Sequence, residues 1–211
     1  MLGSLDIYAD KINIEQKYSY VMERLVHEIS VLAEFIDGFV RIIEKHVKYI
    51  IVSGFVAIAH GRTRGTEDID IIIEKMKKED FIKMHDELIK NNFECMQSSN
   101  PEEIYGSYLE DNASIRYIKK DVFFPQMEVK FAKDALDKYQ LKTRKKLPMT
   151  KLDVYFSSIE MNIAFKEELL KSDKDLEDAK HLRIVYGKDI DETEINEIKK
   201  MIRRLRLNDK R

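Results

Sequence analysis

Apolar residues recur at steps of three and four in the first part of the chain, a period that predicts a long amphipathic helix. The predicted helix covers residues 14–46, and residues 1–13 carry little pattern. Its apolar stripe comprises Val21, Leu25, Ile29, Leu32, Ile36, Phe39 and Ile43. A stripe of this length indicates packing along the domain or against a second copy, so homodimerisation through this N-terminal helix is one prediction.

Between residues 47 and 150 the helical stripe gives way to short apolar runs. The predicted strands are 48–53, 67–73, 93–96, 114–118 and 126–132, and the predicted helices are 55–61 and 78–90. A loop with a short helical turn is expected over 97–112, and the last two strands are joined around 119–125. Because strands alternate with helices here, the pattern argues against a purely antiparallel fold and predicts a mixed sheet.

After Leu152 the pattern is helical again. Predicted helices run from a capping-box pair at Ser157 and Glu160 to Leu170, over 173–186 up to Gly187, and from a second pair at Asp191 and Glu194 to Leu207. The sequence therefore predicts an α/β (α+β) chain in three parts. These are a helical lead over 1–46, a core with a mixed sheet over 47–150, and a helical segment over 151–211.

Composition adds three constraints to this picture. Lys and Arg number 37 against 39 Asp and Glu, so the net charge of -2 gives no global attraction to nucleic acid, and any basic surface is local. A single cysteine, Cys95, excludes an internal disulfide and a cysteine-rich zinc site, and it is predicted to be buried in a strand. No signal peptide or long apolar run is evident, which predicts a cytoplasmic protein without membrane association.

Residues 50–74 carry the candidate chemistry. An apolar strand leads into Ser53-Gly54 and a short helix, and a polar loop then leads into a strand that carries Asp68 and Asp70. Residues two apart in a strand point to the same face, so both carboxylates share one side of the sheet. Two acids on one face of a buried strand are costly unless a cation lies between them. A divalent metal that carries a triphosphate is the natural candidate.

This stretch resembles the nucleotidyltransferase superfamily that includes DNA polymerase beta. Members of the family join a Gly-Gly or Gly-Ser element to an Asp-x-Asp strand. Here Ser53-Gly54 fills the first position, with Ser-Gly in place of Gly-Gly, and Asp68-Ile69-Asp70 fills the second. The finer pattern of His60-Gly61, Arg64 and Thr66 is similar to a branch of small prokaryotic enzymes that includes abortive-infection-type toxins. The resemblance implies a nucleotidyltransferase-type fold, two Mg²⁺ ions, and transfer of an NMP group from an NTP such as ATP to an acceptor hydroxyl.

The family uses a third carboxylate from a neighbouring strand. In Met127-Glu128-Val129-Lys130-Phe131 apolar and polar residues alternate, which predicts a half-buried strand with Glu128 and Lys130 on one face. Glu128 is therefore the main candidate for the third metal ligand and for the group that helps to deprotonate the acceptor. Asp121 is a rival candidate, although its Lys-Lys-Asp setting is typical of a turn.

Several residues are candidates for binding the triphosphate. At Ser53-Gly54 the glycine permits close approach of the backbone to phosphate, and the hydroxyl can donate to the same oxygens. Arg64 either contacts phosphate or pairs with an acid, and Thr66 is expected to order its loop. By resemblance Lys166 reaches the triphosphate, whereas Asp175 and Asp178 brace the helix pair or touch the substrate. A plain salt-bridged helical face is the alternative for these last three.

The remaining alternatives concern the acceptor and the partner. Residues 142–146, Lys-Thr-Arg-Lys-Lys, are the only dense basic run, and they form either a solvated loop or a docking patch for an RNA such as tRNA. A protein, a tRNA or a small molecule would each serve as the acceptor on this fold. Two further hypotheses stay open: a nucleotide- or RNA-binding module whose catalytic set has decayed, and a toxin–antitoxin component with an antitoxin partner.

Overall fold

The computed structural model describes residues 30–66 and 68–207. The chain divides into two units, Met1–Glu34 and Phe35–Arg211. In the first unit the described residues, 30–34, are helical, and Val21, Leu25 and Ile29 of the predicted stripe lie outside the described residues. The second unit begins with a helical run over 35–43.

Seven strands form one mixed sheet in the order β3-β4-β5-β2-β1-β7-β6, which confirms the predicted fold class. The strands are β1 (Tyr49–Val52), β2 (Asp68–Ile73), β3 (Phe93–Cys95), β4 (Ile115–Lys119), β5 (Val122–Phe131), β6 (Lys145–Lys146) and β7 (Tyr155–Phe156). The pairs β2–β5 and β1–β7 are parallel, whereas β1–β2, β3–β4, β4–β5 and β6–β7 are antiparallel.

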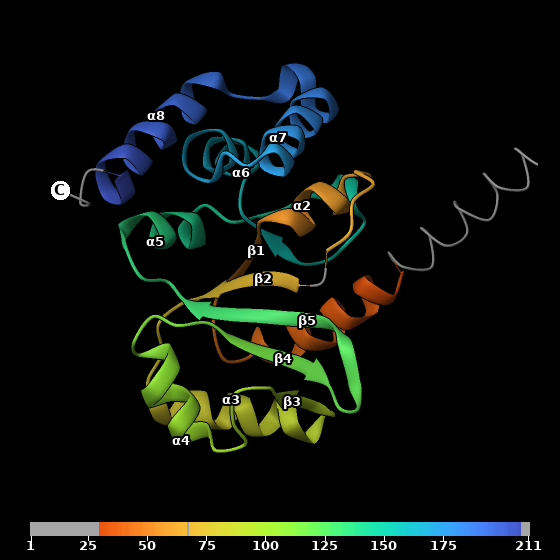
Figure 1. Cartoon of the computed structure of the whole chain (residues 1–211), viewed down its shortest axis with the longest axis vertical. Helices are drawn as coiled ribbons and strands as arrows, with labels where there is room; N and C mark the ends of the chain where they lie inside the picture. The colour runs from red at the N-terminus through yellow and green to blue at the C-terminus, as the bar shows by residue number, and fades with distance from the viewer. Residues whose placement is uncertain (1–29, 67, 208–211) are drawn as a thin grey trace, which may run out of the picture. The chain divides into compact units, whose positions relative to one another are not determined.

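The helices lie on both faces of this sheet and at its ends (Figure 1). The α-helices are α2 (Gly54–Ala59), α3 (Lys78–Lys90), α4 (Pro101–Ile104), α5 (Ala135–Lys142), α6 (Ile159–Phe165), α7 (Asp173–Tyr186) and α8 (Glu192–Ile202). Shorter 3-10 or π turns are η1 (Tyr105–Leu109), η2 (Pro148–Thr150), η3 (Lys166–Leu170), η4 (Gly187–Asp189) and η5 (Arg203–Leu207). In Figure 1 the helices α6, α7 and α8 gather beyond β1, and α3 and α4 lie at the other end, near β3.

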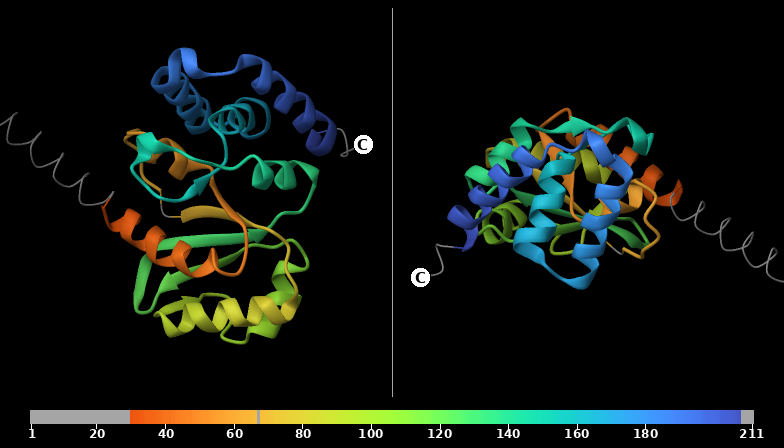
Figure 2. Two further views of the ribbon diagram at one scale, coloured as in Figure 1. Left: turned by 180° about the vertical axis from the view of Figure 1, so that it is seen from behind. Right: turned by 90° about the horizontal axis from the view of Figure 1, so that it is seen from above.

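The two faces of the β2–β5 pair differ in polarity because apolar and polar residues alternate in both strands. On one face the register pairs Ile69 with Met127, Ile71 with Val129 and Ile73 with Phe131, and all six side chains are buried. This face is covered by α3, η1 and the helical residues 35–43. In the left view of Figure 2, seen from behind, these helical residues (orange) lie in front of the sheet, and the centres of the Phe39 and Tyr117 rings are 5.5 Å apart. The opposite face carries the polar residues, including both aspartates of β2.

On the polar face, α5 seals the half of the sheet that lies away from the aspartates. Leu141 of α5 packs with Ile50, Ile72 and Ala132. Asp134 caps the first turn of α5 by accepting hydrogen bonds from the backbone N–H groups of Leu136 and Asp137. The sequence pattern missed this helix as well as β6 and β7, because each is short and lacks an apolar period of its own.

Most predicted elements are present, and two local predictions were wrong. The cap of α6 is Ser158, whose hydroxyl accepts from the Met161 N–H at 3.1 Å, whereas the Ser157 hydroxyl donates to Gln140. The connection expected over 119–125 is a tight turn, because β5 already begins at Val122 and Asp121 adopts a left-handed φ of 63°. Within residues 30–66 and 68–207, no helix combines the length and the apolar character needed to cross a bilayer.

Candidate functional site

Asp70 and Glu128 lie side by side on the polar face of the sheet. The parallel register of β2 and β5 pairs Asp70 with Glu128, and Asp68 pairs with Gln126 one step earlier on the same face. Neighbouring strands are about 4.8 Å apart, so the register brings the backbone positions of Asp70 and Glu128 close together on one face. Asp121 lies instead in the turn before β5, and the register therefore favours Glu128 over Asp121 as the partner of the aspartates.

The surroundings of Asp70 disfavour its negative charge. Burial raises the pKa of the Asp70 carboxyl, and the negative charges of Glu128 and Asp68 add to this rise. Lys130, which follows Glu128 on the same face, and a hydrogen bond from the Ser53 side chain only partly offset it. A partly buried carboxylate beside two others is a setting that a bound cation would relieve.

Glu128 has a cationic partner of its own. Its Oε2 accepts a hydrogen bond from Arg116 Nη2 at 2.5 Å, and Arg116 lies directly opposite Glu128 on β4. Among the described residues, no group of three or more His, Cys, Asp or Glu side chains is arranged so that it could hold a metal ion. The three carboxylates predicted as metal ligands thus occupy adjacent backbone positions, while the Glu128 side chain is directed to Arg116.

Ser53 has a backbone conformation that favours glycine. Its φ of 68° and ψ of -141° lie outside the regions that L-residues normally occupy. Such a conformation costs about 1–3 kcal/mol and persists where the surroundings enforce it. Ser53 directly follows β1, the strand antiparallel to β2, and its side chain lies close enough to Asp70 to lower the pKa of that carboxyl. The strained backbone conformation thus goes together with a position of the Ser53 hydroxyl beside the acidic residues.

We expect Ser53→Gly to stabilise the fold relative to Ser53→Ala, because only glycine removes the strain and both changes remove the hydroxyl. The expected difference in the free energy of unfolding is about 1 kcal/mol or more, measured by urea denaturation. Equal stabilities of the two variants would show that the backbone at this position is not strained.

Gly54 is closely approached by an arginine side chain. A Cβ atom built on Gly54 would lie 2.9 Å from Arg64 Nη2 and 3.0 Å from Arg64 Cζ. The missing side chain therefore makes room for the Arg64 guanidinium, which packs against the start of α2. The close approach that the sequence assigned to phosphate is made in this structure by an arginine of the chain itself.

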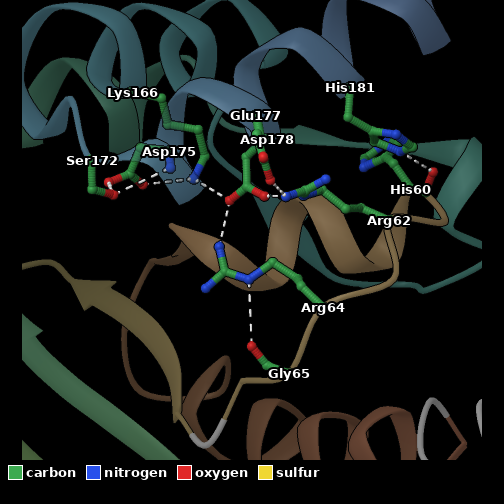
Figure 3. Close-up of polar contacts among 10 residues, drawn as sticks. All are labelled: His60, Arg62, Arg64, Gly65, Lys166, Ser172, Asp175, Glu177, Asp178 and His181. Atoms are coloured by element: carbon green, nitrogen blue, oxygen red, sulfur yellow. Dashed lines mark hydrogen bonds and ion pairs between the residues drawn. The ribbon is translucent and has the colours of Figure 1, made fainter.

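Arg64 belongs to an ionic network centred on Asp178 of α7 (Figure 3). The Asp178 carboxylate is fully buried and accepts from Arg62 Nε at 2.6 Å, Arg64 Nη1 at 2.5 Å and Lys166 Nζ at 2.8 Å. Lys166 is also buried, and it reaches Asp175 at 3.2 Å. Burial opposes ionisation of Asp178, but Lys166 together with the two arginines outweighs it and holds the pKa of the carboxyl below its usual value. The network ties the loop after α2 to the C-terminal helices.

Two further predicted residues have identified contacts. The Thr66 hydroxyl donates to the backbone oxygen of Asp68 at 2.8 Å, so it fixes the entry of the loop into β2. Lys166, predicted to reach the triphosphate, is held by Asp175 and Asp178 but also borders the cavity described next.

A cavity of about 290 Å³ adjoins Ser53 and Asp70. Its cationic lining residues are Lys130, Lys133, Lys166 and Arg206, and amide side chains come from Asn112, Gln140 and Asn162. Asp137, which is paired with Arg206 at 2.7 Å, also lines the cavity, and Phe131, Phe165 and several aliphatic residues complete it. Ligand sites are commonly apolar cavities with a few placed polar groups, and here the polar groups are mostly donors that suit an anion.

Sequence reasoning missed Lys130 and Arg116 as parts of the site. The alternation of Glu128 and Lys130 along one strand face was the signal for Lys130. Arg116 offered no comparable signal, because its place opposite Glu128 depends on the β4–β5 register.

The chain is similar in structure to known proteins. No family model and no curated protein matches the chain. Among solved structures, the antibiotic-resistance factor ANT(2'')-Ia is similar with a TM-score of 0.48 and 12% identity, over 83% of this chain and 92% of the other. An antigenic nucleotidyltransferase-like protein from Paracoccidioides brasiliensis is similar with a TM-score of 0.46 and 16% identity, over 88% of this chain and 90% of the other. Both structural neighbours are of the nucleotidyltransferase kind.

Proposed function

We propose that the chain is a nucleotidyltransferase that moves an NMP group from an NTP to an acceptor hydroxyl. The observation that carries the proposal is the juxtaposition of Asp70 with Glu128 across β2 and β5, with Asp68 on the same face and Ser53 bonded to Asp70. The adjoining cavity supports an anionic substrate at this place through Lys130 and Lys133, which make no ion pair among the described residues, whereas Lys166 and Arg206 are paired with aspartates. The motifs of residues 50–74 support the same reaction independently.

The donor set suits Mg²⁺, because Asp68, Asp70 and Glu128 offer only oxygen atoms, and burial together with the two neighbouring carboxylates raises the pKa of Asp70. These three residues would hold the metal, and Glu128 would exchange Arg116 for it. When bound, the metal supplies charge neutralisation at the transferred phosphoryl group.

The chain's own residues have separate tasks in the transfer. Lys130 and the Ser53 hydroxyl bind the phosphates and orient the α-phosphorus toward the acceptor. The acceptor oxygen forms a bond to the α-phosphorus. At the same time the bond between the α-phosphorus and the bridging oxygen of pyrophosphate breaks, and pyrophosphate leaves with the electron pair. Glu128, the acid nearest Asp70, accepts the proton of the acceptor hydroxyl. The Asp178 network holds the surrounding loop and contributes positioning only.

The test is incubation of the full chain with Mg²⁺, each α-labelled NTP and cell lysate, followed by separation of labelled protein, RNA and small molecules. We expect label from at least one NTP to reach an acceptor, and Glu128→Gln to reduce it by about a hundredfold or more. Glu79→Gln, an exposed carboxylate on α3, is the matched control and should label like the wild type. Absence of both labelling and NTP binding would contradict the proposal.

The ion pair between Arg116 and Glu128 favours a second candidate, a nucleotide-binding module without transfer. If Arg116 keeps Glu128 from the metal, the chain would bind NTP without labelling any acceptor. Arg116→Ala discriminates the two functions. If the wild type only binds NTP because Arg116 holds Glu128, the variant would gain transfer activity, whereas an active wild type would have no transfer to restore.

A further inference from the structure

A second cleft, of about 690 Å³, lies on the other side of α5 from the cavity near Asp70. Asp137 and Gln140 of α5 face the first cavity, whereas Lys138, Leu141 and Lys142 line the second. Figure 1 shows α5 beside β1 and β2, and residues of α5 line both the cavity and the cleft. The second cleft therefore has its own lining and plays no part in the proposed transfer site.

The second cleft has a strong local excess of positive charge. Five of its eight lining residues are cationic, namely Lys48, Lys75, Lys138, Lys142 and Arg144, and one, Glu74, is acidic. Ala132 and Leu141 form its apolar floor. The whole chain has a net charge of -2, so this excess reflects placement rather than composition.

The cations of the second cleft have no carboxylate partner within the described part of the chain. Ion pairs are frequent elsewhere in the structure, yet none of those found there includes Lys48, Lys75, Lys138, Lys142 or Arg144. Arg144 is instead held in place, since it donates to the Tyr49 backbone oxygen at 3.2 Å and lies 4.0 Å from the centre of the Tyr155 ring. A cleft lined by uncompensated cations favours an anionic ligand.

We propose that the second cleft binds the phosphodiester backbone of a single-stranded nucleic acid. The exposed Lys145 of β6, at the edge of the sheet, directly follows Arg144 of the cleft, whereas Lys146 is paired with Asp153 at 2.5 Å. Five cations around one cleft can contact several phosphates at once, and a strand with regularly spaced phosphates supplies them. The apolar lining is limited to Ala132 and Leu141, so the cleft offers charge rather than pockets for the side chains of a peptide. Because Tyr155 is already covered by Arg144, base stacking is minor, and binding depends on phosphates rather than on sequence.

The experiment measures fluorescence anisotropy of a labelled 20-nucleotide RNA, and of a DNA of the same sequence, with the full chain and without NTP or metal. Five phosphate contacts predict a slope of about -3.5 for the logarithm of the binding constant against that of the salt concentration. Lys138→Glu/Lys142→Glu should weaken binding at least tenfold. The matched control is Lys78→Glu/Lys90→Glu on α3, which changes the net charge equally and should bind within threefold of the wild type.

Two additional variants keep the result interpretable. Lys75→Glu lies in the loop after β2 and should weaken binding even if the double change on α5 impairs folding. Asp70→Asn should bind the oligonucleotides like the wild type, so loss of transfer and loss of nucleic-acid binding are separable.

The proposal is overturned if neither RNA nor DNA binds, if the α5 variant binds as tightly as the control, or if polyglutamate competes as well as the oligonucleotides. Equal affinity for RNA and DNA supports backbone recognition, and a preference for RNA supports recognition of its 2′-hydroxyls in addition.

Discussion

Replacing Asp68 and Asp70 together by asparagine is expected to reduce nucleotidyl transfer by at least about a thousandfold and to leave the fold intact. Both carboxylates lie on the polar face of β2, and asparagine retains their size while removing the charge that a phosphate-bound metal needs. The measurement is the labelling assay, with circular dichroism to verify folding. Retained transfer in a folded double variant would mean that the acids are misassigned.

The single change Asp70→Asn should also stabilise the protein at neutral pH. Because the folded-state pKa of Asp70 is raised, ionisation opposes folding above that pKa, and the protonated form is free of this penalty. The stability gained by Asp70→Asn should therefore increase as the pH rises from the unfolded-state pKa, near 4, through the raised folded-state pKa. Below the unfolded-state pKa the gain should vanish. We expect a Tm increase of at least about 2 °C at pH 7.5 and none at pH 3.5. Glu79→Gln is the control, and a Tm that falls at pH 7.5 would contradict the expectation.

Loss of activity with gain of stability would be the signature of a functional site rather than of a structural acid. A carboxylate retained in spite of its electrostatic cost, next to a serine in a glycine-like conformation, combines two unfavourable features at one place. Such features persist where function requires them. If Asp68 and Asp70 were only solvated acids of a strand, the costly Asp70 carboxylate beside the strained Ser53 would have no explanation.

The sequence predicted the face of the sheet on which this site lies because the strand period is rigid. Once Asp68 and Asp70 are in a strand, their common direction follows, and the alternation around Glu128 places it likewise. The boundaries of α3 and α7 were equally accessible, since α3 has a clear apolar period with an asparagine stop and Gly187 ends α7. These predictions needed only local information.

The contacts between distant segments were beyond local reasoning. Nothing near Gly54 indicates that Arg64 would take the space above it, and nothing near Glu128 indicates Arg116 as its partner. The short elements α5, β6 and β7 form because neighbouring strands and the floor around Ile72 complete them. Tertiary packing decides such segments, and their own sequence carries little preference.

Asp178→Ala is expected to destabilise the protein by about 3–5 kcal/mol, the largest stability effect among the proposed variants. The change removes the carboxylate that three cations share and leaves Lys166, which is 1% exposed, with Asp175 as its remaining acidic partner. An uncompensated ammonium in the interior is costly, and its neighbours cannot replace the lost oxygens. The measurement is urea unfolding at pH 7.

The control for this variant is Glu177→Gln, one residue earlier on α7. Glu177 also pairs with Arg62, but its side chain is 66% exposed, so its loss should cost less than about 1 kcal/mol. Similar losses for the two variants would mean that burial of the network does not determine its energy.

The pH dependence gives an independent check of the Asp178 network. Since the folded-state pKa of Asp178 is lowered, its contribution to stability is complete above the unfolded pKa, near 4, and is lost as pH falls through the folded value. The wild type should therefore lose stability below about pH 4 more steeply than Asp178→Ala, and the two unfolding curves should converge in acid. Parallel curves down to pH 2 would contradict an ionised Asp178 at the centre of the network.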